Sequence, residues 1–115
     1  MKIGIEGFSF DSAHYTEGIS DKCSNIHGHT FTVDVRIEEG EINKEDGMVL
    51  DFGILKNNVR KVLENWDHKL LVPQSEMSKI ETKGEFNLEI KPMEENAATT
   101  ENIAKEIAKE IYEKT

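Results

Sequence analysis

Three of the four histidines occupy positions from which they could bind one metal ion. His27 and His29 are separated by a single glycine, and this spacing on a strand places both imidazoles on one face. His14 ends an earlier apolar segment. If the two segments pair as a hairpin, residues 15–26 close the loop and His14 comes beside the other two. Three imidazoles make a zinc site with one open coordination position, which is typical of catalytic zinc.

Other interpretations of these histidines are open. A single strand histidine is usually packed and hydrogen bonded without a metal. An H-x-H pair also occurs in cupin-like barrels, but these need a Glu four or five residues further on, where this chain has Val33 and Asp34. Because no carboxylate completes a two-histidine facial triad at an obvious position, the pattern favours zinc over iron.

Cys23 is the single cysteine and lies four residues before His27. It could be a metal ligand, a buried spectator or a reactive thiol. The surrounding residues 20–25 are polar, which argues against burial in an apolar core. Near a zinc ion and a histidine, the pKa of a thiol can fall to about 7, so Cys23 is a candidate general base.

Asp67 and His68 form a second group that could move protons. They directly follow Trp66, at the end of a predicted helix. The simpler interpretation is a histidine that interacts with the helix dipole. The functional interpretation is that Asp67 orients an imidazole that passes protons.

Two predicted strands position the histidines. Residues 3–13 are rich in β-branched and aromatic side chains, and residues 31–37 alternate between apolar and polar, as in a half-buried antiparallel strand. Residues 48–50 form a possible short third strand. On the first strand, one face carries Phe8, Phe10, Ser12 and His14.

Helical and hairpin patterns follow. Apolar residues recur at helical spacing from Ile54 to Trp66, with Asp51 as the N-cap, and Pro73 ends that region. Residues 77–91 alternate around Lys83-Gly84 and predict a hairpin. Thr99 or Thr100 caps a final helix. Its apolar stripe consists of Ile103, Ala104, Ile107, Ala108, Ile111 and Tyr112.

The order of these elements predicts an α+β fold, in which an antiparallel sheet of about four strands carries two helices on one face. At 115 residues the chain makes a single domain, 1–115. Its net charge of −9 argues against a nucleic-acid partner. No apolar run reaches the roughly 20 residues of a membrane span, so no membrane partner is expected. One cysteine fits a reducing, cytoplasmic location.

Five motifs that cover most of the chain stand out together. They are Phe8-Ser-Phe-Asp-Ser-Ala-His14, Cys23-Ser-Asn-Ile-His-Gly-His29, Gly47-Met-Val-Leu-Asp-Phe52, Trp66-Asp-His-Lys-Leu-Leu71 and Thr99-Thr-Glu-Asn-Ile-Ala104. In combination and in order, they resemble the motifs of the 6-pyruvoyl-tetrahydropterin synthase / 6-carboxytetrahydropterin synthase family.

The resemblance implies a tunnelling fold and a lyase that acts on 7,8-dihydroneopterin triphosphate. It implies one Zn²⁺ per chain on the three histidines, Cys23 as the proton-abstracting thiolate, and a proton relay of Asp67 with His68. Subunits would form a homohexamer, a dimer of trimers, with sites at subunit interfaces. The residues implied to line the pterin pocket are Thr99, Thr100 and Glu101.

The resemblance leaves the product open. The spacing between Cys23 and His27 looks like the branch that forms 6-carboxytetrahydropterin for deazapurine synthesis, and 6-pyruvoyl-tetrahydropterin is the alternative. A homologue that binds pterin or metal without catalysis is a third possibility.

Family members usually carry an E-T pair on a strand after the last helix, whereas this sequence ends at Thr115. Glu81, in Ile80-Glu81-Thr82, or Glu101 could anchor the pterin instead, although Glu81 could also be an exposed hairpin carboxylate. Lys22 and Lys69 could offset the negative charge near a triphosphate.

Overall fold

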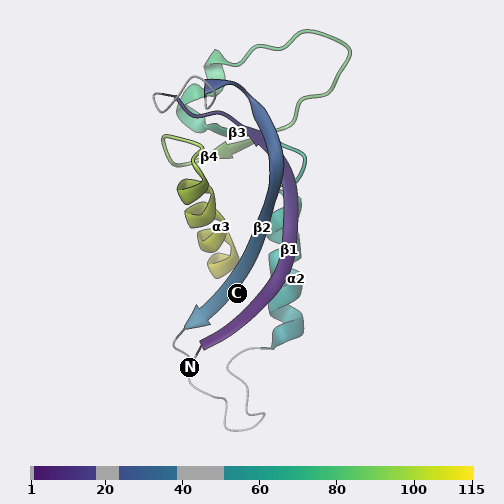
Figure 1. Ribbon diagram of the computed structural model, residues 1–115, viewed down its shortest axis with the longest axis vertical. Coiled ribbons are helices and arrows are strands. Elements are labelled where there is room, and N and C mark those ends of the chain that lie inside the picture. The colour runs from purple at the N-terminus through teal and green to yellow at the C-terminus, as the bar shows by residue number, and fades with distance from the viewer. Residues whose placement is uncertain (1, 18–23, 39–50) are drawn as a thin grey trace.

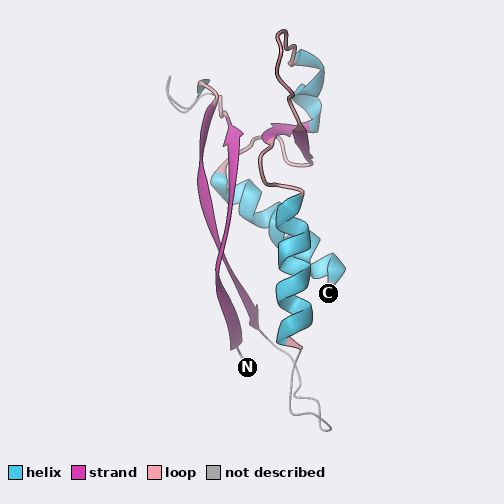
Figure 2. Cartoon of the chain, turned by 90° about the vertical axis from the view of Figure 1, so that its right-hand side faces the viewer, coloured by secondary structure: helices cyan, strands magenta, loops and turns pink. Residues whose placement is uncertain are grey.

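The computed structural model describes residues 2–17, 24–38 and 51–115. Figure 1 shows two long curved strands beside two helices, and Figure 2 shows both helices on the same side of this ribbon. In chain order, the described elements are β1 (Lys2–His14), β2 (His27–Glu38), α2 (Phe52–Glu64), β3 (Leu70–Pro73), the 3₁₀ helix η1 (Gln74–Lys79), β4 (Ile90–Met93) and α3 (Thr100–Lys114). The predicted α+β class, with four strands and two helices on one face, is confirmed.

The four strands form one sheet in the order β2-β1-β3-β4. β1 and β2 are antiparallel as predicted. β3 runs parallel to β1 and to β4, so the prediction of a fully antiparallel sheet is wrong. The connection over residues 74–89 exceeds the dozen or so residues that a parallel crossover needs, and it returns the chain to the same end of the sheet.

The predicted hairpin over residues 77–91 is also wrong. η1 occupies its first part, and residues 80–89 form neither strand nor helix. The alternating Phe86 and Leu88 are 61% and 38% exposed, so their pattern does not reflect burial against a sheet. They line a pocket instead. The possible strand at residues 48–50 lies outside the described residues.

A β-bulge in β1 explains why apolar residues of both parities face the core. The register with β2 shifts between Ile5 and Phe8, where Gly7 has a φ of +91° that glycine adopts without strain. Ile5 and Phe10 are therefore both buried. From Phe8 onward the predicted parity holds and carries Ser12 and His14 into buried positions.

Both helices begin where the sequence predicts. The Asp51 carboxylate accepts hydrogen bonds from the backbone N–H groups of Gly53 and Ile54 at the start of α2. The Thr99 hydroxyl accepts one from Asn102 at the start of α3. Along the predicted stripe of α3, Ile103, Ile107 and Ile111 are buried, whereas Tyr112 is 83% exposed.

The core lies between the sheet and the two helices, and its fully buried side chains include Trp66, Leu71 and Met93. Glu106 is a buried carboxylate of α3, and it accepts hydrogen bonds from the backbone N–H groups of Glu94 and Glu95. No helix among the described residues is both long enough and apolar enough to cross a membrane.

Candidate active site

The β1–β2 hairpin brings the three predicted histidines together. His14 pairs with His27, and Ser12 pairs with His29. The ring centroids of His14 lie 4.6 Å from His27 and 5.0 Å from His29, and those of His27 and His29 are 5.7 Å apart. The predicted pairing of these strands is confirmed.

Backbone carbonyls fix two of the imidazoles. His14 Nδ1 lies 2.7 Å from the Ala98 carbonyl oxygen, and His27 Nδ1 lies 2.8 Å from that of Asn25. Since a carbonyl only accepts, each Nδ1 carries the proton and each neutral ring keeps its lone pair on Nε2. Burial lowers the pKa of His14, and the nearby His27 and His29 lower it further, against the hydrogen bond to Ala98. The neutral form of His14, which metal binding requires, is thus favoured.

The distances between the ring centroids can be compared with those expected for three imidazoles bound to one zinc ion. Three imidazoles that share one ion at about 2.0–2.1 Å place their centroids about 5 Å apart. The observed spacings bracket this value. Among the described residues, however, no group of three or more His, Cys, Asp or Glu side chains is assembled to hold a metal ion. The fit to zinc therefore rests on ring spacing and on the two fixed Nδ1 atoms.

Asp67 and His68 sit in a turn that is hydrogen bonded to β1. His68 Nδ1 lies 2.9 Å from Asp67 Oδ2. The backbone N–H of Asp11 donates to Asp67 Oδ1 at 2.9 Å, and the N–H of His68 donates to the Asp11 carbonyl at 2.6 Å. The Asp11 N–H, and then His68, lower the pKa of Asp67, so its carboxylate stays charged. His68 has a φ of +56°, which costs a residue other than glycine about 1–2 kcal/mol.

Ser12 ties this turn to the histidine cluster. Its buried hydroxyl donates to the Trp66 carbonyl and accepts from the N–H of Lys69 at 3.2 Å. The N–H of Ala13 donates to the Lys69 carbonyl at 3.0 Å. Sequence reasoning assigned no role to Ser12, although a hydroxyl on the apolar face of β1 was a signal that it needs a partner.

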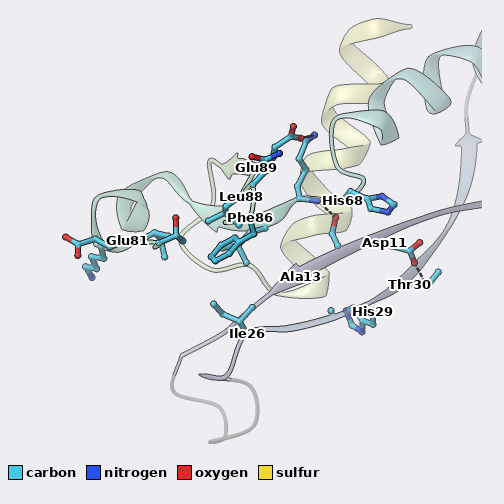
Figure 3. A pocket seen from close by; sticks show the side chains of 18 residues that line it. Asp11, Ala13, Ile26, His29, Thr30, His68, Glu81, Phe86, Leu88 and Glu89 are labelled. Atoms are coloured by element: carbon cyan, nitrogen blue, oxygen red, sulfur yellow. Dashed lines mark hydrogen bonds and ion pairs between the residues drawn. The ribbon is translucent and has the colours of Figure 1, made fainter. Parts of the chain in front are cut away.

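A pocket of about 840 Å³ lies next to these residues (Figure 3). One wall comes from residues 11–13, 28–30 and 68–70, and the other from residues 79–82 and 86–89. His29, His68 and the predicted Glu81 all line it. Lys69 also lines it, but its ammonium group pairs with the Glu89 carboxylate, which reduces the positive charge available to a triphosphate.

Among the described residues, Thr99, Thr100 and Glu101 do not line this pocket. Thr99 caps α3, and its neighbour Ala98 bonds to the His14 ring, so the start of α3 adjoins the cluster. Thr100 lines a different groove, between β2 and α3, and Glu101 is exposed. Cys23 and Lys22 lie outside the described residues, so their predicted roles stay predictions.

Comparisons with known proteins place the chain in one family. A family model described as 6-pyruvoyl tetrahydropterin synthase matches residues 3–115. The 6-carboxy-5,6,7,8-tetrahydropterin synthase of Haemophilus influenzae is 43% identical over 79 residues, which are 65% of this chain and 55% of that protein. The Rickettsia felis protein of the same name is 32% identical over 106 residues, covering 91% of this chain and 76% of that one.

A solved structure shares the fold. The 6-pyruvoyl tetrahydropterin synthase of Plasmodium vivax has a TM-score of 0.76 and 27% sequence identity. The match covers 99% of this chain and 78% of that one. The chain thus spans about half of the Haemophilus protein and about three quarters of the other two relatives.

Proposed function

The chain belongs to the 6-pyruvoyl tetrahydropterin synthase family, and from this premise we propose that it is a zinc-dependent lyase. Its substrate is 7,8-dihydroneopterin triphosphate and its product 6-carboxytetrahydropterin, in keeping with the names of the two curated relatives. The observation that carries the proposal is that the three-histidine cluster of β1 and β2 and the Asp67–His68 pair, which is hydrogen bonded to β1, lie beside one pocket.

His14, His27 and His29 would hold a zinc ion through their imidazole nitrogens. When bound, zinc acts as a Lewis acid that makes substrate hydroxyl groups more acidic. The protein's contribution is to hold two of the rings by their Nδ1–H groups, at Ala98 and Asn25. Such carbonyl partners orient ligating histidines and make them more basic.

Proton transfer falls to Cys23 and His68. A thiolate at Cys23 removes a proton from the substrate side chain, and His68 exchanges protons as acid or base. Asp67 holds the Nδ1 atom of His68, which leaves Nε2 as the atom that exchanges the proton. The Asp11 N–H, and then His68, lower the pKa of Asp67, which favours the anionic form of this partner.

Substrate binding uses residues from two places. Glu81 lines the pocket with His29 and His68, and its carboxylate can accept the two N–H groups on the amino-oxo edge of a pterin. Thr99, Thr100 and Glu101 lie at the start of α3. They complete a site when a neighbouring subunit brings the start of its own α3 to this pocket.

An apolar groove supports self-association into a homohexamer. The groove has a volume of about 970 Å³ and lies between β2 and α3. Val33 and Val35 on β2 and Ala104, Ala108 and Tyr112 on α3 line it, although none of these side chains is fully buried. A second copy would cover this surface, as symmetric oligomers commonly do. A cytoplasmic location suits a chain with one cysteine.

Product analysis tests this function. The zinc-loaded protein is incubated with 7,8-dihydroneopterin triphosphate, and the products are separated and identified by mass. We expect 6-carboxytetrahydropterin. Formation of 6-pyruvoyl-tetrahydropterin would assign the chain to the alternative reaction of the same family. Tight binding without any product would favour a non-catalytic pterin-binding homologue.

A further inference from the structure

Residues 80–89 form one wall of the pocket and carry an aromatic side chain that the proposed chemistry does not use. Phe86 is 61% exposed and faces the pocket together with Leu88. Ile26, which precedes β2, is 62% exposed and lines the same pocket. Large apolar side chains gathered at one exposed place commonly mark a binding surface.

We infer that Phe86 is the stacking surface for the planar heteroaromatic ring of the substrate, with Ile26 on the opposite wall. The inference rests on the proposed function and deepens it. Figure 3 shows Phe86 between Glu81 on one side and His68 on the other, with Ile26 below. A substrate whose aliphatic side chain reaches the histidines therefore has its heteroaromatic ring beside Phe86. The edge of that ring then lies in the part of the pocket that Glu81 lines.

Gly84 positions the Phe86 ring. Gly84 has a φ of +142°, and a Cβ atom built there would lie 2.6 Å from Phe86 Cε1 and 3.0 Å from Cδ1. Only a residue without a Cβ allows the ring to lie so close to the backbone at this φ. The ring is thus supported by residues of its own segment while much of its surface stays exposed.

The chemistry of the surrounding side chains indicates a flat, partly polar ring rather than an aliphatic ligand. A stacked ring presents its polar edge sideways, and Glu81 and the Lys69–Glu89 pair line the pocket around the aromatic surface. Aromatic stacking tolerates many ring systems because every flat heterocycle has a π face. The edge contact at Glu81 then adds selectivity for a ring with adjacent N–H donors.

The test is a titration with neopterin, whose own fluorescence reports binding and which lacks the triphosphate. We expect Phe86→Ala to weaken neopterin binding by about ten-fold or more, in line with the loss of one stacking contact. Phe86→Tyr keeps the flat face and should stay within about two-fold of the wild type. Phe52→Ala is the matched control, because Phe52 is 43% exposed and does not line the pocket. It should bind neopterin like the wild type.

A second variant tests the support of the ring. Gly84→Ala should weaken neopterin binding as Phe86→Ala does, with an unchanged circular dichroism spectrum. Equal affinity of Phe86→Ala and wild type for neopterin, or no binding by the wild type, would overturn the inference. If the wild type binds neopterin through Phe86 but does not convert the triphosphate substrate, the proposed function fails while the stacking surface stands.

Discussion

The two walls of the pocket differ in how they are held. The wall that carries the Asp67–His68 pair is hydrogen bonded to β1 through backbone groups and through the buried Ser12 hydroxyl. Among the described residues, the backbone hydrogen bonds of residues 80–89 lie at the ends of the segment, from Ile80 to Met77 and from Leu70 to Glu89. Groups that transfer protons need a fixed position. This contrast fits the proposed division, in which the first wall carries the proton-transfer pair and the second binds the ring.

The largest expected effect concerns the three histidines of the β1–β2 hairpin. His27→Ala should lower the zinc content from about one ion per chain to near zero, because a three-histidine site loses a ligand. Elemental analysis of purified protein measures this. His68→Ala is the matched control, and it should keep the zinc while kcat falls by about 10²–10⁴-fold. Loss of zinc in His68→Ala, or its retention in His27→Ala, would contradict the assignment of ligands.

A smaller effect is expected at Ser12. Ser12→Ala leaves the Trp66 carbonyl and the Lys69 N–H without their buried partner, which costs about 1–3 kcal/mol of unfolding free energy. For a domain of this size that corresponds to a fall in Tm of several degrees, roughly 4 °C per kcal/mol. Thermal unfolding measures it, with Ser9→Ala, an exposed serine on the same strand, as the control. Equal Tm values would show that the hydroxyl does not hold the turn.

The pH dependence of stability is a further test of the Asp67–His68 turn. Because the pKa of Asp67 is lower in the folded protein, its ionised form stabilises the fold above the unfolded pKa of about 4. This contribution is lost as the pH falls through the folded pKa. The Tm of the wild type should therefore fall more steeply below about pH 4 than that of Asp67→Asn. The difference is small because the side chain is 41% exposed. If the two proteins showed the same dependence of Tm on pH, ionisation of Asp67 would not contribute to stability in acid.

The smallest effect on stability is expected in the second wall. Since Phe86 is 61% exposed, Phe86→Ala should change the free energy of unfolding by no more than about 0.5 kcal/mol, as exposed substitutions usually do. Urea denaturation measures this. A substantial loss of stability would mean that Phe86 supports the fold, and the contrast between the two walls would no longer hold.

The sequence predicts those features that depend on local periodicity and spacing. The parity of Phe8 to His14, the H-x-H spacing and the two caps at Asp51 and Thr99 each depend on a few neighbouring residues, and all are observed. The clustering of the histidines could be predicted as well, because it depends on a single strand pairing, that of β1 with β2.

The features that sequence reasoning missed depend on contacts between distant segments. Alternation at Phe86 and Leu88 indicates a strand, yet the same pattern arises in a segment that lines a pocket. The parallel direction of β3 and β4 depends on where a long connection returns, which periodicity does not encode. Ser12 gained its role only because the turn after α2 packs on β1.

Conversion of 7,8-dihydroneopterin triphosphate before and after removal of zinc tests the central claim most directly. The protein is assayed as purified, after dialysis against a chelator, and after zinc is restored. We expect a tetrahydropterin product from the first sample, none from the second, and recovery in the third. A rate that is the same in all three samples would contradict the assignment of a zinc-dependent lyase.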